Sequence, residues 1–256
     1  RSWEELFVNK KKLLRVLRAL RAKPLCVIWA AYMICAILFK FGYHYTKPKL
    51  HDQMNFTYFE NPELYTGLRD HVATCHFCKE EKACFDAESF YGEDKINSIC
   101  PECLAAGRLL VIDSFTCNGD IDGLRRQLKE IHPDMSSTEI EPLILGKTSL
   151  LERTTPPLIT WQDWEWPCAD GDYCRFIGFG SRPLYERLAT STTGEELFKR
   201  SFSAGLEDDV DTDDLWESVL PEEEIRDFQA TSEMDTLFYV FQSLTTDTIV
   251  TIMDIS

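Results

Sequence analysis

Short catalytic motifs are missing from this sequence. Its 256 residues contain no G-x-S-x-G nucleophile elbow, no G-x-x-x-x-G-K-[ST] phosphate loop and no H-E-x-x-H zinc-peptidase motif. An internal repeat of fixed period is also missing, which excludes solenoid and propeller architectures. The sequence therefore favours a non-enzymatic role, although catalysis by a less regular arrangement of residues stays open.

Positive charge is scarce over most of the chain. Residues 54–256 contain 16 Lys and Arg against 40 Asp and Glu, a net charge of −24, whereas residues 1–53 contain 11 against 3, a net charge of +8. An acidic body repels the phosphate backbone, and so nucleic acid is not the expected partner. A basic protein partner suits the same charge, because electrostatic steering accelerates association between surfaces of opposite sign.

Long apolar runs are missing too. The one extended uncharged run, residues 25–39, has 15 residues, whereas a transmembrane helix needs about 17–25. A basic amphipathic stretch precedes it, and so we predict a basic amphipathic helix and an apolar helix within residues 1–46, followed by a linker over residues 47–55. Whether residues 24–45 span a membrane, lie on its surface or pack in a core stays open.

Cysteine, in contrast, is abundant, and four of the ten cysteines form two close pairs, Cys75-x-x-Cys78 and Cys100-x-x-Cys103, separated by 21 residues. Each pair can place two sulfur atoms on one side of a turn, so that two pairs can surround one ion. Zn²⁺ prefers such a thiolate tetrahedron, which leaves no position for substrate. The spacing predicts one structural Zn²⁺ per chain in a zinc ribbon, with two redox or disulfide pairs as the alternative.

The same cysteines bear on localisation. Metal-bound thiolates are typical of a reducing compartment, whereas secreted proteins use cysteine for disulfides. We therefore expect a cytoplasmic protein, with membrane association through residues 24–45 as the alternative.

Residues 56–256 resemble the CbrC family, small bacterial proteins associated with colicin tolerance that have no assigned biochemical activity. The resemblance rests on an ordered series of short motifs, each weak alone: Phe56-Thr-Tyr58, Cys75 and Cys78, Cys100-Pro-x-Cys103-Leu-Ala-Ala-Gly107, Arg153-Thr-x-Pro156, Trp161-Gln162, Trp166, Cys168 and Cys174, Phe176-Ile-Gly178, and Tyr239-Val-Phe241. It implies a non-enzymatic zinc-binding protein, and a protein-binding or protective module of the toxin-tolerance or immunity type.

The chain departs from that family at its end. Ser243 and Thr246 stand where the resemblance implies a further C-x-x-C pair, and Cys168 and Cys174 are wider apart than the family's usual pair. The resemblance implies a second four-thiolate site, of which only half remains here, because hydroxyls are poor zinc ligands beside thiolates. We therefore expect one metal site. Cys168 and Cys174 are then free thiols, form a disulfide, or make up a degenerate site that binds metal weakly. The alternative function is that of a thiol-redox protein or an enzyme that uses these two cysteines.

The fold expected from these patterns is α+β, with a zinc-ribbon-like, β-rich body and short helices after the N-terminal helical segment. Several segments carry a specific prediction, namely a helix over 120–132, a hairpin of strands over 237–242 and 248–253, a β-type run over 109–112, an extended connection over 149–160 and two short helices within 208–235. The three tryptophans Trp161, Trp164 and Trp166 are expected to pack in the core rather than to form a ligand-stacking wall.

Overall fold

The computed structural model describes residues 55–202 and 211–256. The predictions for residues 1–46, including a membrane-associated segment at 24–45, and for the linker up to residue 54 lie outside the described residues. Within the described ranges, no helix combines the length and apolar character needed to cross a bilayer.

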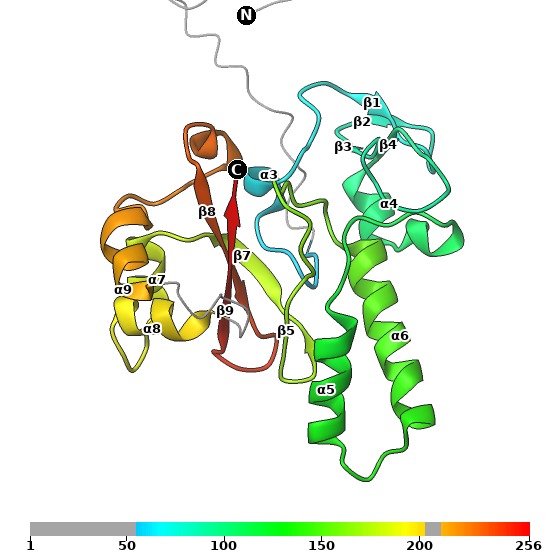
Figure 1. Cartoon of the computed structure of the whole chain (residues 1–256). Helices are drawn as coiled ribbons and strands as arrows, with labels where there is room; N and C mark the ends of the chain where they lie inside the picture. The colour runs from blue at the N-terminus through cyan, green and yellow to red at the C-terminus, as the bar shows by residue number, and fades with distance from the viewer. Residues whose placement is uncertain (1–54, 203–210) are drawn as a thin grey trace, which may run out of the picture. The chain divides into compact units, whose positions relative to one another are not determined.

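The described chain mixes helices with small antiparallel sheets (Figure 1), which confirms the α+β class. The helical elements are α3 (Pro62–Tyr65), α4 (Pro101–Ala105), η1 (Arg108–Val111), α5 (Ile121–Ile131), α6 (Ser137–Thr154), α7 (Arg182–Leu188), α8 (Gly194–Ser201), α9 (Thr212–Asp214), η2 (Leu215–Val219) and η3 (Phe228–Thr231). The strands are β1 (Ala73–Thr74), β2 (Glu81–Lys82), β3 (Phe85–Asp86), β4 (Ser98–Ile99), β5 (Cys168–Ala169), β6 (Asp172–Tyr173), β7 (Arg175–Phe179), β8 (Thr236–Gln242) and β9 (Ile249–Ile255).

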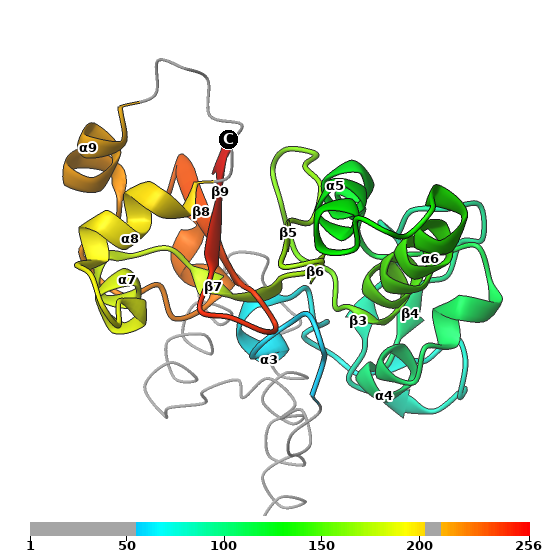
Figure 2. The ribbon, with the colours of Figure 1, turned by 90° about the horizontal axis from the view of Figure 1, so that it is seen from below.

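A three-stranded antiparallel sheet in the order β7-β8-β9 forms the centre of the described chain. β8 and β9 pair without interruption from Thr236↔Ile255 to Gln242↔Ile249, so that the predicted closing hairpin is confirmed. On its other edge β8 pairs with β7, where the register shifts between Phe176 and Gly178. Figures 1 and 2 show α7 and α8 on one side of this sheet and α5 and α6 on the other.

Both faces of β8 are buried, and the alternation of its side chains divides the core in two. Tyr239 and Phe241 belong to the larger cluster on the α5–α6 side, whereas Phe238 and Val240 belong to the cluster formed with α7 and α8. Successive side chains of a strand point to opposite faces, and so a continuous apolar run is what a strand covered on both faces requires.

Aromatic rings fill the larger cluster. Phe176 is fully buried, and its ring centroid lies 5.0 Å from that of Phe59 and 5.5 Å from that of Phe241. Trp166 is also buried, 5.1 Å from Phe241, and Trp164 lies 5.2 Å from Tyr239, both at steep edge-to-face angles. These two tryptophans therefore pack in the core, as expected, because offset and edge-on ring contacts add to the burial of apolar area.

The third tryptophan, Trp161, lies at the surface with 37% of its area exposed, and its segment is fixed to the sheet through the backbone. The carboxylate of Asp254 on β9 is completely buried and accepts hydrogen bonds from the amides of Trp161, at 2.8 Å, and Gln162, at 3.1 Å. Two charge-assisted bonds satisfy the buried carboxylate and hold this otherwise irregular segment in place.

α5 confirms the helix predicted over 120–132. Asp120 caps it by accepting from the amide of Gly123 at 2.7 Å, and Leu124 and Leu128 are buried on one face. An aspartate at this position satisfies one of the free amides of the first turn and complements the helix dipole.

α6 packs against α5 and was not predicted from the sequence. It is 18 residues long and ends at Thr154, so the extended connection predicted over 149–160 is wrong for its first half. Pro156 and Pro157 cannot continue a helix, but they lie beyond the last residue of α6 and therefore do not shorten it. A capping box starts the helix, because Glu139 accepts from the amide of Ser136 at 2.8 Å.

Two further local predictions are wrong in part. The apolar run at 109–112 falls mainly in the 3₁₀ helix η1, which follows Gly107 in the left-handed conformation at φ 69°. The acidic stretch forms the short helical elements α9, η2 and η3, but Pro221–Asp227 between them is not helical. In both places tertiary packing decides the conformation of a segment whose local preference is weak.

Candidate metal centre

The first cysteine pair lies in a tight turn between β1 and β2. The strands pair as Ala73↔Lys82 and Thr74↔Glu81. Within the turn the amide of Lys79 donates to the carbonyl of Cys75 at 3.0 Å, and Lys79 adopts a left-handed φ of 62°. This reversal brings Cys78 back beside Cys75, because a positive φ folds the chain within a few residues.

The second pair lies where β4 leads into α4. Cys100 precedes the helix with an extended backbone, Pro101 occupies its first turn, and Cys103 follows on the helix. Proline suits this position because its fixed φ is helical and its missing N–H needs no partner there. The amide of Cys100 donates to the Cys75 sulfur at 3.3 Å, which ties the second turn to the first.

A second link joins the two turns through Ser98 on β4. Its hydroxyl donates to the carbonyl of Thr74 at 2.8 Å, and its carbonyl accepts from the amide of His76 at 2.9 Å. His76 is not part of the group of side chains that could hold a metal ion.

The four sulfur atoms of Cys75, Cys78, Cys100 and Cys103 all lie within 4.8 Å of one another, and we call them the four-sulfur cluster. The sulfurs of Cys78 and Cys100 are 3.9 Å apart. Zinc–sulfur bonds of about 2.3 Å at tetrahedral angles give sulfur–sulfur distances of about 3.8 Å. The cluster therefore has the size of a tetrahedral thiolate site, and it could hold a metal ion.

Burial and the backbone amides together determine how readily these sulfurs ionise. Burial opposes ionisation of Cys75, but the backbone amides around its sulfur, that of Cys100 above all, outweigh it and lower its pKa to about 7. Burial raises the pKa of Cys103 to about 11 and raises that of Cys100 as well. Without a positive ion only one of these three thiols ionises readily near neutral pH, and a bound divalent cation would supply the charge that ionises the others.

Lys82 is the cation that lies near the cluster. Its ammonium pairs with Glu80 at 2.7 Å and Glu102 at 3.8 Å, and the hydrogen bond to Glu80 above all raises its pKa. Both carboxylates favour the protonated form of the lysine, and their negative charges offset its positive charge. Lys82 therefore offers the cluster only part of one positive charge.

Two neighbouring cysteines stay outside the cluster. Cys84 is fully buried, its thiol donates to the carbonyl of Ala73 at 3.5 Å, and burial raises its pKa to about 11. Burial raises the pKa of Cys117 to about 12. Both thiols are protonated at neutral pH and fill space as small apolar groups.

Cys168 and Cys174 are not joined by a disulfide in this structure. Within the described residues, neither belongs to a group of side chains that could hold a metal ion. Cys168 lies near Gln127, whose Nε2 donates to its sulfur at 3.3 Å, and burial raises its pKa to about 12. Cys174 is fully buried, and burial raises its pKa too. A redox dithiol needs an exposed, low-pKa thiol, and this pair offers none.

Residues 54–255 match an uncharacterised protein family, UPF0167. The chain belongs to this family. The match extends over the four-sulfur cluster, the central sheet and every described helix. The family match therefore covers nearly all of the residues that the structure describes. No solved structure gives a significant match to the chain.

In this member of UPF0167, Ser243 and Thr246, which stand where the resemblance implied a further C-x-x-C pair, both bind an aspartate. Asp170 lies in the turn between β5 and β6 at a left-handed φ of 55°. Its Oδ2 accepts hydrogen bonds from Thr246, at 2.6 Å, and from Ser243, at 2.7 Å. Hydroxyls and one carboxylate therefore hold the β5–β6 turn to the β8–β9 loop without a metal. No sequence pattern marks Asp170, because its partners Ser243 and Thr246 lie 73 and 76 residues away.

Replacing Asp170 with asparagine should lower the free energy of unfolding by less than about 1 kcal/mol, because the turn is largely exposed. Asparagine tolerates the left-handed backbone, and so only the charge changes. Hydrogen bonds from Thr246 and then Ser243 lower the pKa of Asp170. The stabilisation is therefore present above the usual carboxyl pKa and is lost as pH falls through the lowered value. Urea unfolding at neutral pH and near pH 3 checks this, and a difference that grows on acidification would contradict it.

Proposed function

We propose that this protein is a non-enzymatic, zinc-stabilised binding module of the CbrC type, whose acidic surface recognises a basic protein partner. The observation that carries the proposal is the four-sulfur cluster, in which four cysteine sulfurs lie within 4.8 Å of one another. Zn²⁺ suits this ligand set because borderline-soft ions prefer tetrahedral thiolate.

The ion would have a structural part in this proposal. Cys75, Cys78, Cys100 and Cys103 would hold it, and four protein ligands leave no position for water or substrate. Each pair comes from a different turn, so a bound ion would fasten the β1–β2 turn to the start of α4. Elements of only two to five residues bury little area, and such elements commonly need a metal to fold.

The partner's charge follows from the composition of the body. Residues 54–256 carry a net charge of −24, and eight of their 16 lysines and arginines form an ion pair with a carboxylate. A basic surface would be drawn to this body over a distance set by the ionic strength. A protective role against a toxin protein is consistent with the resemblance to the CbrC family and with this charge.

The thiol-redox alternative has no comparable support, because the thiols of Cys168 and Cys174 are buried or half-buried and have raised pKa values. A membrane-tethered accessory protein, the other alternative, depends on residues 24–45 and so on a part of the chain outside the described residues.

Capture of a partner at two ionic strengths tests the proposal. The immobilised full chain should retain a basic protein from bacterial lysate at about 0.05 M salt and release it at about 0.5 M, because screening shortens the reach of surface charge. Retention that does not depend on salt, or no retained protein even at low salt, would contradict it.

A further inference from the structure

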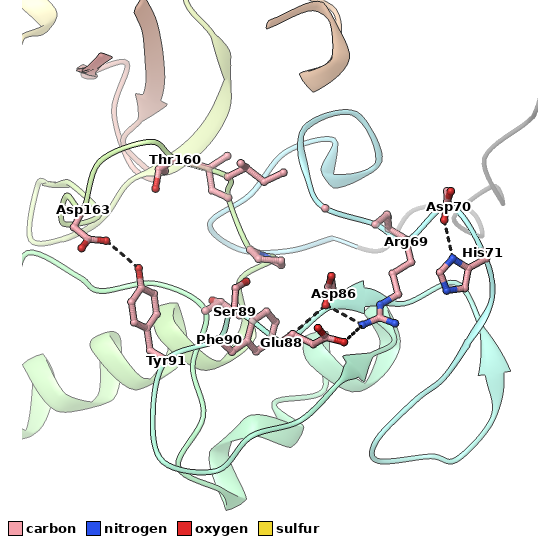
Figure 3. A pocket seen from close by; sticks show the side chains of 16 residues that line it. Arg69, Asp70, His71, Asp86, Glu88, Ser89, Phe90, Tyr91, Thr160 and Asp163 are labelled. Carbon is pink, nitrogen blue, oxygen red and sulfur yellow. Dashed lines mark hydrogen bonds and ion pairs between the residues drawn. The ribbon is translucent and has the colours of Figure 1, made fainter. Parts of the chain in front are cut away.

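A cleft of about 720 Å³ lies between three separate segments of the chain. It is bounded by the chain that enters β1, the loop that follows β3 and the connection that follows α6 (Figure 3). Its volume falls within the range of about 300–1,000 Å³ that is usual for ligand pockets. The four-sulfur cluster does not line it, so the cleft is separate from the site described above.

The ionisable side chains of the cleft are mostly carboxylates. Four acidic residues line it against a single arginine, with one histidine in addition, namely Asp70, Asp86, Glu88, Asp163, Arg69 and His71. The arginine is already engaged, because its Nη2 lies 2.9 Å from Asp86 and 3.1 Å from Glu88 and also donates to the carbonyl of Asn97 at 2.9 Å. Figure 3 shows the guanidinium turned toward these carboxylates. The cleft thus has a net negative charge.

An aromatic platform lies at the opposite end from Arg69. The ring of Tyr91 stacks on that of Phe115, with centroids 5.5 Å apart and planes inclined by 18°. Reciprocal backbone hydrogen bonds of 3.0 and 3.3 Å between the two residues fix the pair. Tyr91 is nevertheless 40% exposed, although an aromatic ring of this size usually packs inside. A rigid, exposed ring face of this kind attracts cations through its quadrupole.

Asp163 completes the platform. Its Oδ1 lies 3.4 Å from the Tyr91 hydroxyl, a weak hydrogen bond that leaves most of the carboxylate's capacity to accept from a ligand. Apolar residues of the connection after α6, Pro157, Leu158 and Ile159, line the wall between the platform and Arg69. The cleft therefore presents a carboxylate beside a ring face, next to an apolar wall.

We propose that this cleft binds an arginine-containing segment of a protein partner, with one guanidinium on the face of Tyr91 and against Asp163. The inference rests on the proposed function and names the surface that would carry it. Guanidinium suits the site better than ammonium, because it is planar, stacks on aromatic rings and can donate two parallel hydrogen bonds to one carboxylate. The apolar stem of the arginine would lie along Leu158 and Ile159.

Fluorescence anisotropy with a labelled peptide of alternating glycine and arginine tests this on the full chain at about 0.15 M salt. Asp163→Asn should weaken binding about tenfold, since it removes the charge but keeps the shape and an acceptor for Tyr91. Tyr91→Leu should weaken binding about three- to fivefold, whereas Tyr91→Phe, which keeps the ring face, should leave it nearly unchanged. Glu93→Gln is the matched control, because it removes one charge close to the cleft without lining it.

Three results would overturn the inference. The first is an equal effect of Asp163→Asn and Glu93→Gln, which would mean attraction by diffuse surface charge. The second is no binding of the peptide. The third is equally tight, Asp163-dependent binding of spermidine, which would make a free polyamine the occupant.

The failure of this inference and that of the proposed function can be told apart. A basic partner that the wild-type chain and Asp163→Asn retain equally would contradict the cleft and leave the binding module intact. Asp163-dependent binding of the arginine peptide with no protein partner retained at low salt would contradict the proposed function and leave the cleft intact.

Discussion

Replacing Cys100 with serine should unfold the region around the metal centre and abolish zinc binding. Cys100 is fully buried, and its sulfur lies 3.9 Å from that of Cys78. A serine hydroxyl does not ionise near neutral pH and is a poor zinc ligand beside thiolates. Structural zinc contributes about 10–16 kcal/mol of apparent folding free energy, as much as the net stability of a whole domain. We therefore expect a loss of most of the cooperative thermal transition.

Cys84→Ser is the matched control for that variant. Cys84 is also fully buried and lies close to the same strands, but its thiol donates to the carbonyl of Ala73 and takes no part in the four-sulfur cluster. A hydroxyl can make the same hydrogen bond, so the cost should stay near about 1–2 kcal/mol. Thermal unfolding followed by circular dichroism, with zinc analysis of each variant, checks both. Equal losses for the two serine variants, or a Cys100→Ser protein that keeps its zinc, would contradict the metal centre.

Replacing Phe176 with alanine should lower the free energy of unfolding by about 3–5 kcal/mol, the usual cost of removing a large buried ring. Phe176 is fully buried on β7, and its ring contacts those of Phe59, which precedes α3, and of Phe241 on the neighbouring strand β8. Removing it leaves a cavity that these aromatic side chains cannot close without leaving their rotamers.

The control for Phe176→Ala is Leu145→Ala on α6, because Leu145 is 64% exposed and its removal creates no cavity. It should change the free energy of unfolding by less than about 0.5 kcal/mol. Urea unfolding of both variants measures the difference, with the slope of each transition as a check that the same surface is exposed. A cost below about 1 kcal/mol for Phe176→Ala would show that the ring cluster is not the main core.

The sequence predicted the parts of this structure that depend on neighbouring residues. The spacing of Cys75 and Cys78, and of Cys100 and Cys103, places each pair in one turn, and the structure brings the two pairs together. The closing hairpin was predicted from two strand-like runs on either side of a short polar turn, and α5 from apolar residues at helical spacing. In each case the determining interactions span only a few residues.

Where the structure differs from the predictions, the physical reasons can be identified. The capping box at Ser136 and Glu139 marks the start of α6, whereas Pro156-Pro157, which favours an extended chain, follows the end of that helix. The β-branched residues of 109–112 favour strand, yet this segment packs beside α6 as the 3₁₀ helix η1. Side chains that meet only through the tertiary fold gave no sequence signal. Asp170 with Thr246 is one example, and Tyr91 with Asp163 is another.

Zinc content measured together with free thiols tests the central claim most directly. Elemental analysis of the purified full chain should give one zinc per chain. A strong chelator should then make four more thiols react with an alkylating reagent, because the four-sulfur cluster is released. A chain that contains no zinc and whose thiols react equally with and without chelator would contradict the account.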